Sequence, residues 1–278
     1  MPELPEVETM RRGVAPVAGA RIARVTLPRR ADVRPLEVSP SPRAFRRGVE
    51  GREVAAVARA GKRLVLELSD GGRVVFEPRM TGLALLTDPP SEKHVRARFQ
   101  LEGGAAPELV LWDRRGLGTL RLHDEEGYRR EVLAKLGKDG LALEDGDLEA
   151  ALGASARPIK VGLLDQAAVA GVGNIYAVEA LFAARIDPLR ECRALQPAEW
   201  RRLRKELVAV LEHAVRYEGS TLGDGTYRNA LNQDGSYQSE HRVYGREGER
   251  CRRRGCRGAV VRVVLGQRAT FYCPACQG

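Results

Sequence analysis

The sequence predicts an α+β protein of two domains, because the first half of the chain has the period of short strands and the second half the period of helices. Between residues 20 and 122, apolar runs such as 64–68 and 74–76 are short and are separated by turn residues. Several such strands, with Gly and Pro between them, predict a β-sandwich. In the second half, apolar residues recur three and four positions apart, most clearly over 197–219, which predicts amphipathic helices.

The expected elements follow in order along the chain. A short helix is expected from residue 3 to about 15, ending near Gly13, and strands follow up to about residue 122. Further helices are expected over 159–168, 175–184 and 197–219, with a β-hairpin after residue 251. The predicted domains are residues 1–125 for the sandwich with its N-terminal helix, 126–156 for a linker, 157–248 for the helical domain and 249–278 for the terminal hairpin.

The chain has 278 residues and a formal net charge of +9, with 46 Lys and Arg against 37 Asp and Glu. Arg binds phosphate in a planar, bidentate manner, so this excess favours a polyanionic partner. An Arg-rich proteome would give the same excess, and charge alone therefore supports a nucleic acid only weakly. Apolar runs are shorter than the ~20 residues that span a bilayer, and no secretory signal is recognisable. We therefore expect a cytoplasmic protein without membrane contact.

Four cysteines near the end of the sequence form two pairs on either side of the predicted hairpin: Cys251 with Cys256, and Cys273 with Cys276. Two thiolate pairs at the open end of a hairpin predict one tetrahedral zinc ion. A pair of disulfides is the alternative, which a reducing cytoplasm disfavours. Four cysteine ligands leave no open position on the metal, so the expected role is structural. Cys192 remains, and is expected to be a small packing residue.

The first eight residues carry an unusual combination of an amine and carboxylates. If Met1 is removed, the chain begins with the secondary amine of Pro2, and an α-amino group has a pKa near ~8. Such an amine can attack an aldehydic carbon and form an iminium. Glu3, Glu6 and Glu8 lie close by in sequence and could move protons for it. The alternative is an acidic first helical turn, favoured by the helix dipole.

Two weaker local signals remain. Residues 171–174 form a Gly-rich turn that opens a helix, where free N–H groups could bind an anion, although a tight helix–helix connection explains the turn equally well. Lys62 precedes a strongly alternating strand, where it is either an edge charge or a cation beside the mouth of the sandwich.

Four segments together resemble the bacterial formamidopyrimidine-DNA glycosylase family, and the resemblance runs nearly from end to end. They are Pro2-Glu3-Leu4-Pro5-Glu6-Val7-Glu8-Thr9, Gly171-Val172-Gly173-Asn174-Ile175-Tyr176-Ala177, Val243-Tyr244-Gly245-Arg246 and Gln267-Arg268-Ala269-Thr270-Phe271-Tyr272-Cys273. The sister type, endonuclease VIII, differs after its first Pro-Glu pair. The opening of this chain therefore favours the branch that removes damaged purines.

The resemblance implies a two-domain DNA-repair enzyme. Its N-terminal β-sandwich carries the catalytic amine, and its C-terminal domain carries a helix–two-turn–helix motif and the zinc hairpin. The partner is double-stranded DNA with a damaged base, which is turned out of the helix. Pro2 would attack the sugar carbon, expel the base and form the iminium, and eliminations would cut the strand on both sides. We expect a monomer with one structural zinc ion and no organic cofactor.

The resemblance also assigns roles to individual residues. Glu3 corresponds to the general acid/base, Glu6 to a second carboxylate near the sugar, and Lys62 to the lysine near the lesion. The stretch 218–238 occupies the position of the family's lesion-recognition loop. The implied DNA-binding residues are Asn174, Arg268, Lys160, Tyr244, His94, Arg115, Met80 and Leu117.

Two segments depart from the family pattern. Glu77-Pro78-Arg79-Met80 stands where the family has His-Leu-Gly-Met, which keeps the void-filling Met80 but adds a carboxylate that would repel phosphate. Residues 113–118 stand where the family has Asp-Pro-Arg-Arg-Phe-Gly. There Arg115 matches the arginine that faces the orphaned base, while Leu117 replaces an aromatic wedge. We expect a shifted lesion range or a weaker interrogation of intact DNA.

Three other functions are consistent with parts of the sequence. One is a catalytically silent binder of damaged DNA, and another is a zinc-hairpin protein that binds structured RNA. The third is an endonuclease VIII-like glycosylase for oxidised pyrimidines, because the atypical segments are those that choose the base.

Overall fold

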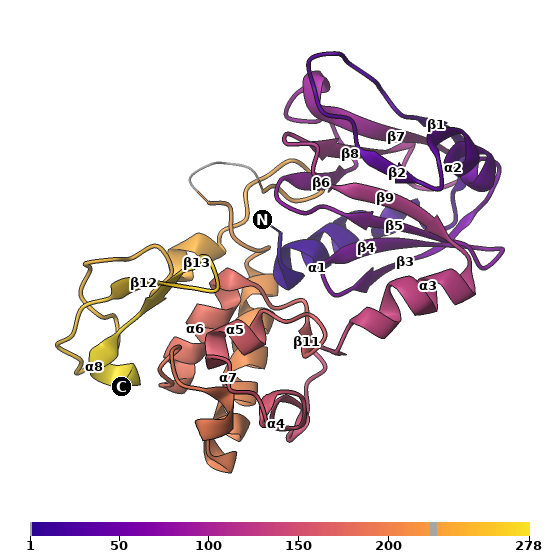
Figure 1. The fold of residues 1–278 in the computed structure, drawn as a ribbon. Coiled ribbons are helices and arrows are strands. Elements are labelled where there is room, and N and C mark those ends of the chain that lie inside the picture. Colours follow the sequence, from indigo (N-terminus) through magenta and orange to yellow (C-terminus); the bar gives the residue numbers. More distant parts are fainter. Residues whose placement is uncertain (1, 223–226) are drawn as a thin grey trace. The chain divides into compact units, whose positions relative to one another are not determined.

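The computed structural model describes residues 2–222 and 227–278. Its chain divides into two compact units (Figure 1). The first unit contains the described residues of Met1–Ala134 and Tyr217–Gln238, and the second contains Lys135–Arg216 and Ser239–Gly278. The return of Tyr217–Gln238 to the first unit is a feature that the sequence analysis did not anticipate. Among the described residues, no helix is both long and apolar enough to cross a membrane.

Two β-sheets form the body of the first unit, which confirms the predicted sandwich. The four-stranded sheet is antiparallel and has the order β1 (Arg21–Thr26), β7 (Val95–Glu102), β8 (Glu108–Asp113) and β6 (Gly82–Leu85). The five-stranded sheet has the order β2 (Glu37–Ser39), β9 (Thr119–His123), β5 (Arg73–Glu77), β4 (Arg63–Leu68) and β3 (Val54–Ala60). Within the second sheet β2 is parallel to β9, and the other pairs are antiparallel.

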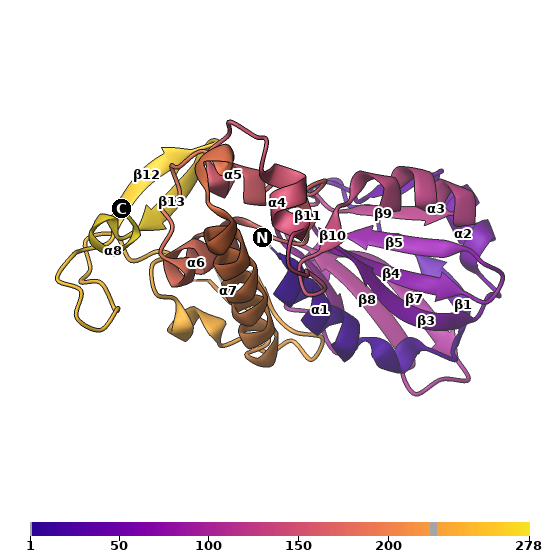
Figure 2. The same ribbon diagram turned by 90° about the horizontal axis from the view of Figure 1, so that it is seen from below.

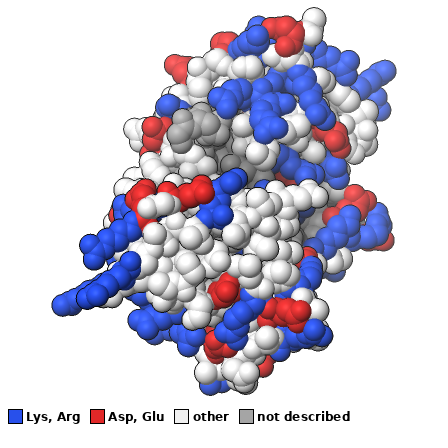
Figure 3. Space-filling view, turned by 60° about the vertical axis from the view of Figure 1, so that its left-hand side comes forward, with Lys and Arg blue, Asp and Glu red and all other residues white. Residues whose placement is uncertain are grey.

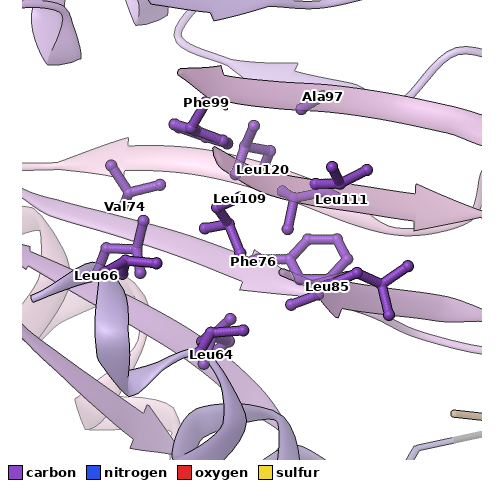
Figure 4. Packing of buried hydrophobic residues seen from close by; sticks show 14 of the residues in the cluster. Leu64, Leu66, Val74, Phe76, Leu85, Ala97, Phe99, Leu109, Leu111 and Leu120 are labelled. Carbon is purple, nitrogen blue, oxygen red and sulfur yellow. The ribbon is translucent and has the colours of Figure 1, made fainter. Parts of the chain in front are cut away.

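The core of the first unit lies between these two sheets (Figure 4). Leu64, Leu66 and Phe76 of the five-stranded sheet and Leu109 and Leu111 of the four-stranded sheet are all nearly inaccessible to solvent. Alternate residues of a strand point to the same face, so the period of two read in residues 64–68 places one apolar row in this core.

The N-terminal helix α1 (Leu4–Gly13) packs against β3, β4 and β6 of the sandwich (Figure 2). Leu4, Val7 and Met10 are fully buried, as their spacing of three residues on one helix face requires. Gly13 ends the helix, and a Cβ there would come within 2.4 Å of the Cβ of Ala230. Glycine therefore allows the segment Tyr217–Gln238 to approach the end of α1.

Short helices complete the first unit and its boundary. They are η1 (Ala15–Val17), α2 (Pro42–Val49), η2 (Glu92–His94), α3 (Glu125–Glu131), η3 (Leu133–Lys135) and η5 (Tyr237–Glu240). Side chains cap two of them, since Ser41 accepts a hydrogen bond from the backbone of α2 and Asp124 accepts one from that of α3.

The second unit is mainly helical and ends in a β-hairpin. Its elements are β10 (Lys138–Asp139), α4 (Asp147–Leu152), α5 (Ile159–Leu163), β11 (Val169–Ala170), α6 (Asn174–Ala184), η4 (Cys192–Ala194), α7 (Pro197–Arg216), β12 (Val261–Leu265), β13 (Arg268–Tyr272) and α8 (Pro274–Gln277). α7 packs on α6 through a buried stripe that includes Trp200, Leu203 and Leu207, as its period predicts. The segment 126–156, expected as a linker, contains parts of α3 as well as β10 and α4.

The helix expected over 159–168 is wrong in length, since α5 ends at Leu163. After Leu163, polar side chains rather than helical bonds pair with backbone N–H and C=O groups. Asp165 accepts a hydrogen bond from the N–H of Ala167 at 3.0 Å, and the amide of Gln166 bonds to the carbonyl of Val172 at 2.9 Å and the N–H of Gly171 at 3.0 Å. Such local bonds compete with helical ones and stop the helix.

Glu8 of α1 is a buried carboxylate that holds the helix to the sandwich. It accepts hydrogen bonds from Arg11 at 2.8 and 2.9 Å, from Arg12 at 2.9 Å and from Arg59 of β3 at 3.1 Å. Burial alone would raise the pKa of Glu8, but these bonds outweigh it and lower the pKa from its usual 4.5 to about 2. The ionised form of Glu8 is therefore the one that stabilises the fold.

Replacing Glu8 by Gln is expected to lower the free energy of unfolding at pH 7 by about 3 kcal/mol, because the buried guanidinium of Arg59 loses its counter-charge. Since the folded pKa lies below the unfolded one, the stabilisation by Glu8 is complete above pH 4.5 and is lost as the pH falls toward 2. Urea denaturation at a series of pH values from 7 to 2.5 measures the free energy of unfolding. In the Glu8→Gln variant this free energy should fall less steeply below pH 4.5 than in the wild-type chain.

The control is Glu102→Gln, since Glu102 pairs with Arg21 at a site where both side chains are 60% exposed. Its effect should stay below about 1 kcal/mol. Equal effects of the two substitutions would contradict the assigned role of Glu8.

Candidate active site and nucleic-acid interface

Glu3 and Glu6 form a reciprocal cap at the start of α1. The side chain of Glu3 accepts the N–H of Glu6, and Glu6 Oε2 accepts the N–H of Glu3 at 2.8 Å. The two residues are 2% and 1% exposed, and Pro2, which precedes them, is also buried. The acidic helix start considered from the sequence is therefore present, and it places two buried carboxylates within four residues of Pro2.

The other oxygen of Glu6 binds the segment that returns to the first unit. Glu6 Oε1 accepts the N–H of Ser220 at 2.8 Å, and the Tyr227 hydroxyl donates to the backbone carbonyl of Glu6 at 3.4 Å. Gly219 has a φ of +77°, and a Cβ there would come within 2.7 Å of Glu6 Oε1. Burial raises the pKa of Tyr227 well above 10, so its hydroxyl remains a donor. Within the stretch 218–238, residues 223–226 lie outside the described residues.

This arrangement suits the chemistry of an N-terminal amine. A secondary amine that adds to a sugar carbon needs an acceptor for its proton and a donor for the leaving group. Carboxylates fixed by backbone N–H groups keep one geometry through both steps, since they do not have to reorganise. The segment that contains Ser220 also covers Glu6, which reduces the access of water to its carboxylate.

Lys62 lies in the tight turn between β3 and β4 and is half-buried. The neighbouring Arg59 donates to the carbonyl of Gly61 at 3.0 Å and also to Glu8 of α1 at 3.1 Å. The turn that carries Lys62 is therefore tied to the helix that carries Glu3 and Glu6, with Arg59 as the connecting side chain.

Met80, Arg115 and Leu117 lie on two connections between the sheets of the sandwich. The Met80 turn (residues 78–81) joins β5 to β6, and the Leu117 loop (residues 114–118) joins β8 to β9. Met80 and Leu117 are half-buried and Arg115 is exposed. The structure thus brings these three predicted residues to neighbouring strand ends.

The carboxylate of Glu77 is neutralised by two arginines. It lies 3.4 Å from Arg63 and 3.1 Å from Arg79. The phosphate repulsion expected from Glu77 is therefore offset. Arg79 has a φ of +50°, a left-handed conformation that normally favours glycine, and it is about half exposed. This turn thus presents a basic side chain next to Met80.

His94 lies at the end of η2 and packs edge-on against Trp112 of β8, with ring centroids 5.7 Å apart. Its Nδ1 atom is buried and has no hydrogen-bond partner among the described residues. Burial, followed by the charges of Arg96 and Lys93, lowers the pKa of His94. At neutral pH it is therefore an uncharged ring rather than a phosphate-binding cation.

The predicted DNA-binding residues of the second unit converge on the hairpin β12–β13. Lys160 of α5 is fully buried and its Nζ donates to the carbonyl of Leu265 at 3.3 Å. Asn174, the first residue of α6, donates to the carbonyl of Ala269 at 2.9 Å, and its buried Oδ1 has no partner among the described residues. Arg268 is exposed at the start of β13 between these two anchor points.

Tyr244 contacts the same hairpin from another direction, since its ring lies 5.3 Å from that of Phe271 in β13. Its backbone is held by Glu179, a residue that the sequence analysis missed. Glu179 Oε1 accepts the N–H groups of Arg242, Val243 and Tyr244 at 3.1, 3.0 and 2.8 Å. Burial raises the pKa of Glu179, against the effect of these bonds. The available signal was that Glu179 is the one charged residue in the otherwise hydrophobic run 175–184.

The four cysteines after residue 250 meet the geometry of a zinc site. Their sulfur atoms all lie within 4.8 Å of one another. The Cys251–Cys276 and Cys256–Cys273 sulfur pairs are 3.9 and 3.7 Å apart. Sulfurs bound to one Zn²⁺ at about 2.3 Å lie about 3.8 Å apart in a tetrahedron. The residues therefore fit one structural zinc ion.

The surroundings of the cysteines also suit thiolates. The N–H of Arg253 donates to Cys251 Sγ and that of Gly258 to Cys256 Sγ, each at 3.4 Å. A Cβ at Gly258 would come within 2.9 Å of Cys273 Sγ, so glycine is needed for this close approach.

Not every arginine near the zinc site is free to bind phosphate. Arg253 donates to the carbonyl of Phe182, and its Cζ atom lies 4.7 Å from the centroid of the Phe182 ring. Arg252 donates to the carbonyl of His241 at 3.1 Å. These two side chains therefore fix the cysteine-bearing segment that starts at Cys251 to the rest of the second unit. Figure 3 shows Lys and Arg side chains gathered in several groups on one face of the molecule.

Three regions of the chain match known families. Residues 1–120 match the formamidopyrimidine-DNA glycosylase N-terminal domain, residues 136–225 match the H2TH domain of that glycosylase, and residues 248–278 match a zinc finger found in FPG and IleRS. The chain is 41% identical to the formamidopyrimidine-DNA glycosylase of Thermus thermophilus, over 100% of this chain and 99% of the relative. It is 35% identical to that of Rhizobium meliloti, over the whole of both chains.

Solved structures are similar over the same extent. The crystal structure of the MutM (Fpg) protein from Thermus thermophilus has a TM-score of 0.86 and 40% identity, covering 100% of this chain and 99% of that one. The complex of Lactococcus lactis Fpg with DNA containing an abasic site has a TM-score of 0.85 and 30% identity, covering 99% of each chain.

Replacing Cys273 by Ala is expected to remove the bound zinc and unfold the terminal hairpin, because three thiolates no longer close the tetrahedron. The measurement is the zinc content of the purified chain, together with the resistance of residues 249–278 to cleavage by a protease. Cys192→Ala is the matched control, since Cys192 is buried outside the cluster and should leave the zinc content unchanged. Equal zinc in both variants would contradict the assignment.

Replacing Gly219 by Ala is expected to destabilise the first unit more than the same change at Gly103. Both glycines have a φ of +77°, so both variants lose about 1 kcal/mol to backbone strain. A Cβ at Gly103 meets nothing within 4 Å, whereas one at Gly219 meets Glu6. Unfolding in urea should therefore show an additional loss of about 1–3 kcal/mol for Gly219→Ala. Equal losses would mean that Glu6 does not hold this segment.

Proposed function

The chain belongs to the formamidopyrimidine-DNA glycosylase family and is a DNA glycosylase of base excision repair, and we propose that Pro2 is its nucleophile. In this proposal the amine of Pro2, free after removal of Met1, attacks the sugar carbon of a damaged nucleotide. The bond to the base breaks, the base leaves with the bonding electrons, and the sugar opens to an iminium on Pro2. Successive eliminations from the iminium then release the phosphates on both sides.

The observation that carries the proposal is the burial of Pro2 beside the reciprocal cap of Glu3 and Glu6. Glu3 is proposed as the general acid/base, because it is the first carboxylate after the amine. Glu6 is proposed to keep the cap and the segment at Ser220 in place near the sugar. Lys62, whose turn is tied to α1 through Arg59, is proposed to contact the phosphate next to the lesion.

The second unit is proposed to grip the DNA backbone. Arg268 is exposed on a hairpin held by the zinc ion and by Lys160, and Asn174 begins α6 beside it. Backbone phosphate contacts position a protein on DNA without reading its sequence. Tyr244, whose backbone is fixed through Glu179, is proposed as a further contact to the DNA backbone. The nucleoid is proposed as the place of action.

Oxidised purines such as 8-oxoguanine and formamidopyrimidines are proposed as the preferred substrates, because the opening octapeptide follows that branch of the family. Met80 and Leu117 are proposed to fill the gap left by the extruded nucleotide, with Arg115 against the orphaned base. Leu117 stacks less well than an aromatic ring. We therefore propose a lesion range or opposite-base preference that differs from that of relatives with Phe at this position.

Borohydride treatment of the wild-type chain with a duplex containing an abasic site is expected to yield a covalent adduct at Pro2, because the reductant converts the iminium to a stable amine. Glu3→Gln should lower base excision by at least about 100-fold, as expected for loss of a general acid/base. Glu37→Gln, a change at an exposed carboxylate paired with Arg121, is the control and should remain active.

The same trapping experiment separates the competing functions. Lys62→Met should still form the adduct, and its loss in that variant would make Lys62 the nucleophile instead of Pro2. A wild-type chain that binds the duplex without any adduct would be a catalytically silent binder. A panel of 8-oxoguanine, formamidopyrimidine and thymine glycol duplexes, with structured RNA as competitor, then defines the substrate class.

A further inference from the structure

Asp113 is a buried carboxylate that the mechanism above does not use. It is the last residue of β8 and is 1% exposed. Its Oδ1 accepts hydrogen bonds from the Thr81 hydroxyl and, at 3.1 Å, from the N–H of Arg115. Its Oδ2 accepts the N–H of Gly118 at 2.8 Å. One side chain thus binds both the Met80 turn, through Thr81, and the Leu117 loop at two positions.

The topology of the sandwich explains why one carboxylate can reach both segments. The Met80 turn crosses from the five-stranded to the four-stranded sheet, and the Leu117 loop crosses back (Figure 1). Their flanking residues are paired, since Glu77 lies opposite Thr119 and Gly82 opposite Asp113. The two crossings therefore lie side by side at one end of the sandwich.

Further contacts make this junction rigid. The Thr81 hydroxyl also accepts the N–H of Arg115 at 3.0 Å, which closes a three-membered network with Asp113. Arg96 is 3% exposed and donates to the backbone carbonyl of Asp113 at 2.8 Å. A Cβ at Gly118 would lie 3.2 Å from Asp113 Oδ2 and 3.0 Å from the carbonyl of Glu77, so the loop has little room to shift.

We propose that Asp113 is a positioning residue that locks the Met80 turn and the Leu117 loop into one preformed unit for entering the DNA stack. This inference rests on the proposed function, in which Met80, Arg115 and Leu117 take the place of an extruded nucleotide. A buried carboxylate that accepts N–H and O–H donors makes stronger bonds than a neutral acceptor. Loops held in the bound geometry also lose less conformational entropy when they insert.

The distinguishing consequence concerns substrates with and without a base to extrude. A paired lesion must be unstacked before it can react, whereas an abasic site has no base to displace. A defect in the preformed unit should therefore lower excision of a paired 8-oxoguanine more than cleavage at an abasic site. A general loss of folded protein would lower both activities equally.

The test compares Asp113→Asn and Thr81→Val with the wild-type chain in single-turnover reactions on both duplexes. Both oxygens of Asp113 accept hydrogen bonds, and in Asn one of them is replaced by an NH₂ group that cannot accept. Val at position 81 removes the hydroxyl that bridges Asp113 and Arg115, at nearly constant side-chain volume. Each variant is expected to reduce the ratio of lesion excision to abasic-site cleavage by roughly ten- to hundred-fold. Hydrogen exchange at the amides of Arg115 and Gly118 should become faster in the protein without DNA.

Two matched variants serve as controls. Thr81→Ser keeps the hydroxyl, and Asp70→Asn changes an exposed carboxylate that also accepts a backbone N–H in a turn of the same unit. Both should retain the wild-type ratio. An unchanged ratio in Thr81→Val, or an equal loss on both duplexes, would overturn the role of Asp113. A wild-type chain that cleaves neither duplex would instead overturn the proposed function.

Discussion

The burial of three carboxylates in the first turns of α1 is the constraint on which the first unit depends. Charged groups taken out of water destabilise a fold unless hydrogen bonds and counter-charges compensate them. Glu3 and Glu6 are compensated by each other's backbone N–H groups, and Glu8 by three arginines, including Arg59. Since Arg59 belongs to β3, the charge of Glu8 also fixes the helix against the sandwich.

The same constraint explains why the chain returns to the first unit after α7. The cap uses only Oε2 of Glu6, and the N–H of Ser220 donates a hydrogen bond to the other oxygen, Oε1. The close approach needs residues without side chains at two points, which are Gly219 beside Glu6 and Gly13 beside Ala230. The candidate active site is therefore assembled from the chain start, the β3–β4 turn and a segment more than 200 residues away.

Buried polar groups also organise the second unit. Glu179 collects three consecutive N–H groups and thereby fixes Tyr244 against the hairpin, while the cysteines hold the open end of that hairpin. Lys160 and Asn174 then reach hairpin carbonyls from two helices. Each proposed phosphate contact thus stands on a rigid support, and such supports keep functional groups in a defined geometry.

By itself the sequence determined the strand and helix periods, the cysteine spacing and the opening octapeptide, because these signals lie within a few neighbouring residues. It also identified most of the candidate site through the family resemblance. Only the tertiary structure decided that Glu8 has Arg59 as a partner, that Asp113 joins two loops and that Glu77 is neutralised by Arg63. It also decided that α5 stops at Leu163. Hydrogen-bond and charge partners that are distant along the chain are chosen by packing, and no local period encodes them.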